Sequence, residues 1–102
     1  MVTQFQQKVY EILIRVPSGR VTTYKEIGNV FGKDGNIYRA IGQALNKNPF
    51  APKVPCHRVV SSDGSLGGFA HGTAAKIALL EKEGVAVVDG KIVDFERKVW
   101  RF

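Results

Sequence analysis

Three prolines within seven residues constrain the fold of this chain most, because they exclude a regular helix from its middle. Pro49, Pro52 and Pro55 each lack a backbone donor, and each pushes the residue before it toward extended geometry. We therefore expect a non-helical loop over 49–55 that leads directly into Cys56, with the helical segments on either side of it.

The residues before this loop predict three helices. The first spans about 3–16, because Thr3 and Gln6 form a capping-box pattern and apolar residues follow at helical spacing. A second helix is expected over about 24–31 and a third over about 37–46. The side chains expected to cap these two helices are Thr23 and Asn36. Two short helices joined by a glycine-bearing turn are typical of a helix-turn-helix.

The residues after Cys56 predict a further helix and a hairpin. A glycine-rich stretch at 67–72, which we expect to form a binding loop, precedes a fourth helix over about 73–83 that Gly84 ends. Two β-rich runs within 85–93 flank Asp89-Gly90, a pair that favours a type I′ hairpin turn.

These elements predict one domain that occupies residues 1–102, because a chain this short has a single modest core. The expected fold is mainly α with short strands: a helix-turn-helix, winged-helix-like DNA-binding domain with a C-terminal β-hairpin. We expect the tail to pack back on this domain through Phe95, Val99 and Trp100.

The distribution of charge favours a polyanionic partner. The chain carries 15 Lys and Arg against 9 Asp and Glu, a net charge of +6. Residues 20–58 hold seven of the basic side chains and two of the acidic ones, so +5 of the +6 lies there. Because many small basic proteins bind no nucleic acid, charge alone does not decide the function.

Composition also limits location and metal binding. No apolar run approaches the roughly 20 residues of a membrane-spanning helix, and no leader pattern opens the chain, so we expect a cytoplasmic protein that contacts no membrane. The single cysteine cannot form an internal disulfide. With only His57 and His71 beside it, a closed zinc site is excluded, and we predict no metal.

The tetrapeptide Pro55-Cys56-His57-Arg58 is the candidate chemical centre. A free thiol is a weak nucleophile at neutral pH unless a base takes its proton or positive charge stabilises its anion, and His57 and Arg58 can supply either. The alternative is that Cys56 is a small buried hydrophobe. Adjacent residues on a strand point to opposite faces, so adjacency of Cys56 and His57 does not by itself make a reactive pair.

The segment 55–60, Pro-Cys-His-Arg-Val-Val, resembles the active-site signature of the O6-alkylguanine-DNA alkyltransferases. The resemblance covers about residues 4–84. Further segments that match at the family's spacings are Phe5 to Val9, Gly19 to Tyr24, Arg39 to Leu45, Asn48-Pro49, Leu79-Leu80 and Glu83-Gly84.

This resemblance implies a catalytic set. Cys56 would accept the alkyl group, while His57 would take the thiol proton through a water and Glu83 would orient the imidazole. Tyr24 would stabilise or protonate the departing base, and Asn48 would brace the active-site turn.

The resemblance also implies the DNA contacts. Arg39 would enter duplex DNA from the minor groove and fill the gap left by the flipped nucleotide. Further side chains expected on the DNA are Tyr38, Thr23, Gln43 and Arg58. The pocket for the base would comprise Val59, Phe69, Ala70 and Tyr24, with the carbonyls of Val59 and Cys56 accepting from guanine's exocyclic amine. The implied partner is double-stranded DNA containing O6-alkylguanine, bound by a monomer that needs no cofactor.

The chain departs from the family's pattern at three places. The amino-terminal domain of many members is not expected here. At Phe69 many members have tyrosine, and Tyr38 is bulkier than the small residue often found before the arginine.

Two other functions are considered. Alkyltransferase-like proteins bind O6-alkylguanine without reaction and flag it for excision repair, but they generally carry tryptophan or alanine where this chain has Cys56. A winged-helix regulator with an inert or redox-sensing cysteine would be expected to dimerise on paired half-sites, and no dimerisation helix is predicted.

Overall fold

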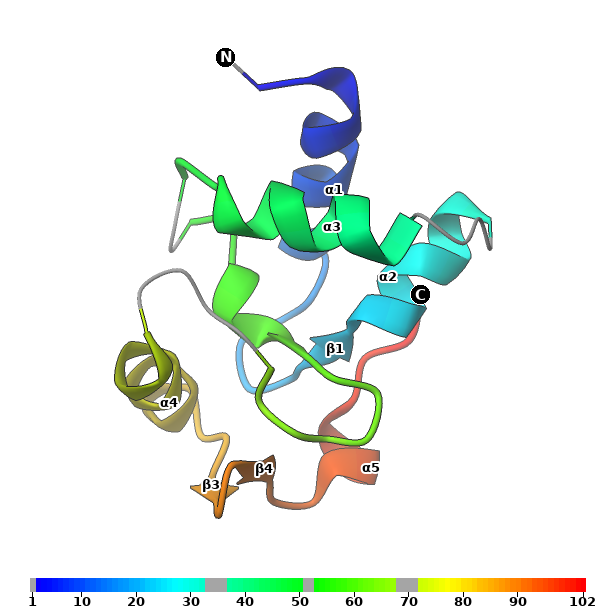
Figure 1. The fold of residues 1–102 in the computed structure, drawn as a ribbon. Coiled ribbons are helices and arrows are strands. Elements are labelled where there is room, and N and C mark those ends of the chain that lie inside the picture. The colour runs from blue at the N-terminus through cyan, green and yellow to red at the C-terminus, as the bar shows by residue number, and fades with distance from the viewer. Residues whose placement is uncertain (1, 33–36, 51–52, 68–71) are drawn as a thin grey trace.

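A computed structural model describes residues 2–32, 37–50, 53–67 and 72–102 of the protein. The mainly α fold with short strands and a C-terminal hairpin is confirmed (Figure 1). The elements in chain order are α1 (Gln4–Ile14), β1 (Thr22–Thr23), α2 (Tyr24–Phe31), α3 (Ile37–Asn46), the 3₁₀ helix η1 (Cys56–Arg58), β2 (Val59–Val60), α4 (Thr73–Lys82), β3 (Val87–Val88), β4 (Lys91–Ile92) and α5 (Phe95–Lys98).

Helix α1 begins as its capping box predicts. The Thr3 hydroxyl accepts from the Gln6 amide at 3.1 Å, and the Gln6 side chain accepts from the Thr3 amide at 2.8 Å. The helix ends at Ile14, before the predicted end at Val16. Its buried side chains are Val9, Tyr10, Ile12 and Leu13.

Helices α2 and α3 form the predicted helix pair. The Thr23 hydroxyl accepts from the Glu26 amide at 3.0 Å and caps α2. Helix α3 packs on both α1 and α2, and the buried Tyr10 hydroxyl donates to the Ala44 carbonyl at 2.8 Å. The predicted cap Asn36 and most of the turn before it lie outside the described residues.

Strand β1 lies between this helical part and the rest of the chain (Figure 1). It pairs in parallel with β2, so that Thr22 lies opposite Val59 and Thr23 opposite Val60. On the other edge, Val21 forms a parallel bridge with Val99 of the tail. The sequence did not predict this pairing, because pairing between such distant segments leaves no local periodicity.

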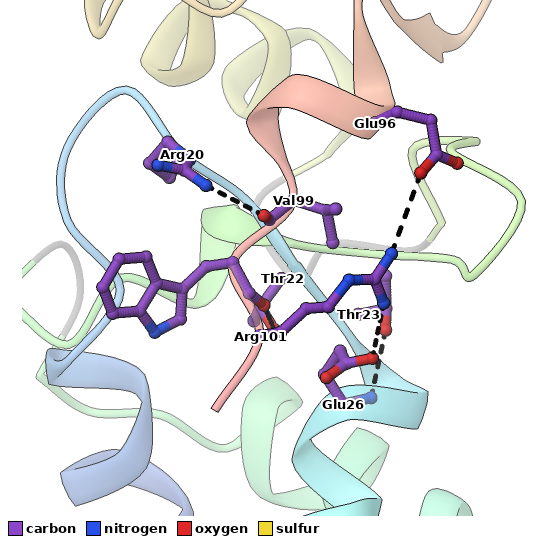
Figure 2. Close-up of polar contacts among 8 residues, drawn as sticks. Arg20, Thr22, Thr23, Glu26, Glu96, Val99 and Arg101 are labelled. Carbon is purple, nitrogen blue, oxygen red and sulfur yellow. Dashed lines mark hydrogen bonds and ion pairs between the residues drawn. The ribbon is translucent and has the colours of Figure 1, made fainter.

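The C-terminal tail packs back on the domain, as predicted, and polar side-chain contacts hold it there (Figure 2). The Trp100 amide donates to the Val21 carbonyl, and the Thr22 hydroxyl donates to the Trp100 carbonyl at 3.1 Å. The Arg20 guanidinium lies 5.6 Å from the centre of the Trp100 ring. Arg101 pairs with Glu26 of α2 at 2.9 Å. The tail therefore holds the start of the helix pair.

The remaining elements form the second half of the molecule. Helix α4 ends at Lys82, and Gly84 then takes a φ of +86°. Asp89 and Gly90 have φ values of +51° and +74°, as a type I′ turn requires, and join β3 and β4 into the predicted hairpin. The strands are shorter than predicted, and the one-turn helix α5 was not predicted.

Two apolar clusters stabilise these halves. One lies between α1, α2 and α3 and includes Val9, Ile27, Ile41 and Cys56. The other joins the β1 and β2 region to α4 and the hairpin. Among the described residues, no helix is long and apolar enough to cross a membrane.

A close contact between α2 and α3 yields a stability prediction. A Cβ on Gly28 would lie 2.6 Å from Cε1 of Tyr38, whereas a Cβ on Gly42 of α3 would meet no atom within 4 Å. We expect Gly42→Ala to raise the free energy of unfolding by about 0.5–1 kcal/mol through helix propensity. Gly28→Ala should lower it by about 1 kcal/mol, because displacement of the Tyr38 ring outweighs that gain.

Urea denaturation of both variants measures these changes, and the pair Gly28→Ala with Tyr38→Ala tests their cause. In the Tyr38→Ala background, Gly28→Ala should stabilise as Gly42→Ala does. Equal stabilisation by both substitutions in the parent chain would contradict the contact.

Candidate functional site

Cys56 lies on a turn that the preceding loop holds in place. The Asn48 side chain donates to the Val54 carbonyl and accepts from the Phe50 amide, both at 2.9 Å. The Cys56 amide donates to the Val54 carbonyl at 2.9 Å, and the Pro55 carbonyl accepts from Arg58 at 3.0 Å. These hydrogen bonds involve backbone amides and carbonyls of the proline-rich loop. The side chain of Asn48 therefore stabilises the loop that leads into the cysteine turn.

The 3₁₀ geometry of this turn changes the relation between Cys56 and His57. Three residues per turn place successive side chains about 120° apart, not on opposite faces as in a strand. Both side chains are buried: Cys56 is 6% exposed and packs in the first apolar cluster, and His57 is 2% exposed. The thiol is thus a core group with an imidazole as its chain neighbour.

His57 faces Glu83, the C-cap residue of α4. Its Nε2 lies 3.1 Å from Glu83 Oε1, although among the described residues Nε2 has no well-aligned hydrogen bond. Burial lowers the pKa of His57, and the Glu83 carboxylate opposes this effect. At neutral pH the imidazole is therefore mainly neutral, which is the form that can accept a proton.

Glu83 is shared between His57 and Arg58. Arg58 donates to both carboxylate oxygens, Nε to Oε1 at 2.9 Å and Nη2 to Oε2 at 2.5 Å. Burial alone would raise the pKa of Glu83, but the hydrogen bonds from Arg58, together with the contact to His57, outweigh burial and lower it. The carboxylate is therefore ionised beside the imidazole.

Two side chains expected on DNA are used inside the protein. The third donor of Arg58, Nη1, binds the Val16 carbonyl at 2.8 Å, so all its described bonds run to protein acceptors. Thr23 is 4% exposed, and its hydroxyl caps α2. The sequence predicted the cap at Thr23 but not the inward contacts of Arg58, because Val16 and Glu83 are distant from Arg58 in the chain.

Tyr24 begins α2 beside the cysteine turn. It is half-buried, and a Cβ on Gly67 would lie 3.6 Å from its hydroxyl. Burial raises the pKa of Tyr24, and the charge of Cys56 adds to this rise. The phenol therefore stays protonated and able to donate at neutral pH.

The outer face of α3 carries the other side chains expected on DNA. Tyr38, Arg39 and Gln43 are exposed, while the buried residues of this helix face α1 and α2. A surface hollow next to Tyr38 is lined by Tyr24, Lys25, Tyr38 and Ser62. Lys25 and Ser62 were not predicted as site residues, although the positive charge of Lys25 in the basic middle of the chain was a usable signal.

Part of the predicted base pocket is outside the described residues, namely Phe69 and Ala70. Of the two other pocket residues, Tyr24 is half-buried, and Val59 is fully buried at the start of β2. His71, which was expected in the same loop, is also outside them. In the part of the chain that the structure describes, no group of three or more His, Cys, Asp or Glu side chains could hold a metal ion.

Lys76 is a polar residue of the site that sequence reasoning missed. It is fully buried on α4, and its Nζ donates to the carbonyls of Val59 at 2.7 Å and Leu66 at 2.5 Å. Burial lowers the pKa of Lys76 to about 8, against an opposing effect from Cys56. No sequence signal marks it, because an isolated lysine on a helix is usually a solvated charge.

The comparisons with known proteins agree with this geometry. A family model described as "6-O-methylguanine DNA methyltransferase, DNA binding domain" matches residues 4–85. A methylated-DNA--protein-cysteine methyltransferase of Methanosarcina barkeri is 48% identical over 81 residues, which is 79% of this chain and 51% of the relative. The chain spans about half the length of the curated relatives it matches, 51%, 40% and 52% for three of them.

Two solved structures are similar to this chain, one over most of its length and the other over all of it. Mycobacterium tuberculosis OGT in complex with DNA is 43% identical, with a TM-score of 0.76 over 82% of this chain and 51% of its own. S. pombe Atl1 in complex with damaged DNA containing O6-carboxymethylguanine is 29% identical, with a TM-score of 0.83 over 100% of both chains.

The lowered pKa of Lys76 predicts how stability varies with pH. Between about pH 8 and 10.5 the unfolded chain retains a lysine proton that the folded chain has released. The free energy of unfolding therefore rises with pH in this window, by on the order of 3 kcal/mol from this group. Lys76→Met removes that contribution.

Urea denaturation of the parent chain and of Lys76→Met across this window measures the difference between their stabilities. It should grow in favour of the parent chain as pH rises. Lys82→Met, which removes an exposed lysine from the same helix, should leave the pH dependence unchanged. Parallel curves for the parent chain and Lys76→Met would contradict the lowered pKa of Lys76.

Proposed function

Because this chain belongs to the 6-O-methylguanine DNA methyltransferase family, we propose that it repairs DNA by moving an alkyl group, typically methyl, from O6 of guanine to Cys56. The reaction consumes the cysteine, so each molecule acts once. We propose that residues 1–102 act as one domain, as a monomer in the cytoplasm, without a cofactor or metal. Its partner is double-stranded DNA that contains O6-alkylguanine.

The observation that carries this proposal is the buried thiol next to an imidazole that faces an ionised carboxylate. With Nε2 of His57 directed at Glu83, Nδ1 is the nitrogen left to act as a base. We propose that Nδ1 takes the Cys56 proton through a water, while Glu83 stabilises the resulting imidazolium. Arg58 holds Glu83 in place for this role.

The transfer itself exchanges one bond for another. The Cys56 sulfur attacks the alkyl carbon in line, the new S–C bond forms, and the C–O6 bond breaks with its electron pair going to guanine. Tyr24 then donates to the departing base, a role supported by its raised pKa. Asn48 contributes by keeping the cysteine turn in one conformation.

Access to the lesion requires that the nucleotide leave the stack, because a stacked base cannot present its O6 substituent to a protein nucleophile. We propose that Arg39 enters the duplex from the minor groove and occupies the gap. The exposure of Arg39, Tyr38 and Gln43 on one helix supports this contact. Val59 and Tyr24, together with Phe69 and Ala70, would form the pocket for the flipped base.

A second candidate function is recognition without transfer. Similarity to S. pombe Atl1 over the full length of both chains favours a protein that binds O6-alkylguanine and flags it for excision repair. Retention of Cys56, where proteins of that kind generally carry tryptophan or alanine, favours transfer.

Intact mass after incubation with a duplex containing O6-methylguanine tests the proposal. The parent chain should gain one methylene, with a stoichiometry of one per molecule, whereas Cys56→Ser should gain nothing. An undamaged duplex of the same sequence is the control for the DNA. An unchanged mass, together with preferential binding of the damaged duplex, would make recognition without transfer the correct function.

Alkylation should also destabilise the protein. Cys56 packs in the first apolar cluster, so a methyl group on its sulfur adds volume to a filled space. Overpacking of this kind typically costs about 1–3 kcal/mol. We expect a lower melting temperature for the methylated protein than for the same preparation before reaction. An unchanged melting temperature in fully modified protein would contradict the packing of Cys56 in the core.

A further inference from the structure

Lys76 occupies a place where a lysine is rarely found. It is fully buried, although lysine is almost never so unless its ammonium is paired. Its ammonium donates to carbonyls of different segments: Val59 begins β2, directly after the cysteine turn, and Leu66 precedes Gly67. One ammonium on α4 therefore ties together two backbone segments that are separate in the sequence.

These two segments border the reactive group from two directions. The Val59 amide donates to the Cys56 carbonyl and so continues the cysteine turn. Gly67 follows Leu66 and lies against the Tyr24 ring, where a Cβ would be 3.6 Å from the phenol oxygen. Movement of either carbonyl would thus change the space between Cys56 and Tyr24, in which the proposed substrate base must lie.

The hydrogen bonds from the Lys76 ammonium also orient the carbonyl groups that accept them. A hydrogen bond from a charged donor is roughly twice as strong as one between neutral groups. A carbonyl oxygen has two lone pairs, so one donor orients it without using all of its acceptor capacity. Two ionisable side chains interact electrostatically with Lys76. Cys56 favours the charged ammonium, and the ammonium lowers the pKa of His57.

We propose that Lys76 is a positioning residue that determines specificity for guanine, because its ammonium orients the Val59 carbonyl toward the base's exocyclic amine. This inference rests on the proposed function and on the contact between that carbonyl and the amine that the family resemblance implies. A base with the same O6-methyl group but without the amine, O6-methylhypoxanthine, leaves the second lone pair of the oriented Val59 carbonyl without a donor. Lys76 thereby discriminates against it without contacting the base.

Competition between two duplexes tests this inference. O6-methylguanine and O6-methylhypoxanthine in one otherwise identical sequence react together with a limiting amount of protein, and the consumed fraction of each is measured. The parent chain should prefer O6-methylguanine by on the order of tenfold or more. Lys76→Met should reduce this preference to about threefold or less, because the carbonyl loses its orienting donor.

Matched variants separate this role from a purely structural one. Lys82→Met, also on α4 but exposed, removes the same charge and should keep the preference. Lys76→Arg, which retains charge and donors, should restore part of it. Because both duplexes compete for the same folded molecules, a lower folded fraction cannot change the ratio. Should Lys76→Met not fold, as judged by circular dichroism, Lys76→Gln provides the measurement.

An unchanged ratio in Lys76→Met, at any overall rate, would overturn the inference, as would a parent chain that does not discriminate. Failure of the proposed transfer is recognised separately, since the parent chain would then gain no mass with either duplex. In that case the same preference is measured as competitive binding of the two duplexes. Loss of that binding preference in Lys76→Met would support the role of Lys76, and its persistence would refute it.

Discussion

The ion pair between Arg58 and Glu83 is the interaction on which the rest of the site depends. Arg58 is the last residue of the cysteine turn, Glu83 is the C-cap of α4, and a third guanidinium nitrogen binds the Val16 carbonyl after α1. Both side chains are 15% exposed, so the pair is screened less than a surface ion pair. Removal of one partner would leave a largely buried charge, which is more costly than the pair itself is stabilising. One guanidinium thus joins both halves of the molecule at the reactive turn.

This arrangement also sets the protonation states around the thiol. The carboxylate of Glu83 contacts both Arg58 and His57, and the contact with Arg58 is the stronger one because it is bidentate. His57 retains a contact at 3.1 Å that is not well aligned, and its burial keeps the neutral form favoured. A carboxylate wholly committed to His57 would hold the imidazole more firmly in its charged form. The ion pair therefore leaves His57 able to accept a proton.

Local signals in the sequence predicted those parts of the fold that local interactions decide. The capping box at Thr3, the cap at Thr23 and the turn at Asp89-Gly90 each involve residues close in the chain, and each is present. The parallel pairing of β1 with β2 and the inward direction of Arg58 depend on partners 25 or more residues away. Lys76 was missed for the same reason, since nothing near it in the chain explains its burial. The family resemblance implied that Glu83 orients His57 and that Asn48 braces the turn, but it implied neither the ion pair of Arg58 with Glu83 nor the contacts of Lys76.

A reactive thiol inside a packed cluster is unusual for a nucleophile that must be regenerated. Repeated catalysis needs a route for the modified group to leave and for the site to return to its first state. A transfer that occurs once per molecule has no such requirement, so the proposed function is compatible with a Cys56 that packs in one apolar cluster with Ile41 and Val59. The same burial permits an ammonium and an ionised carboxylate to act at close range in a low dielectric. The proposed chemistry and the packing of Cys56 are thus consistent, because neither requires the site to survive the reaction unchanged.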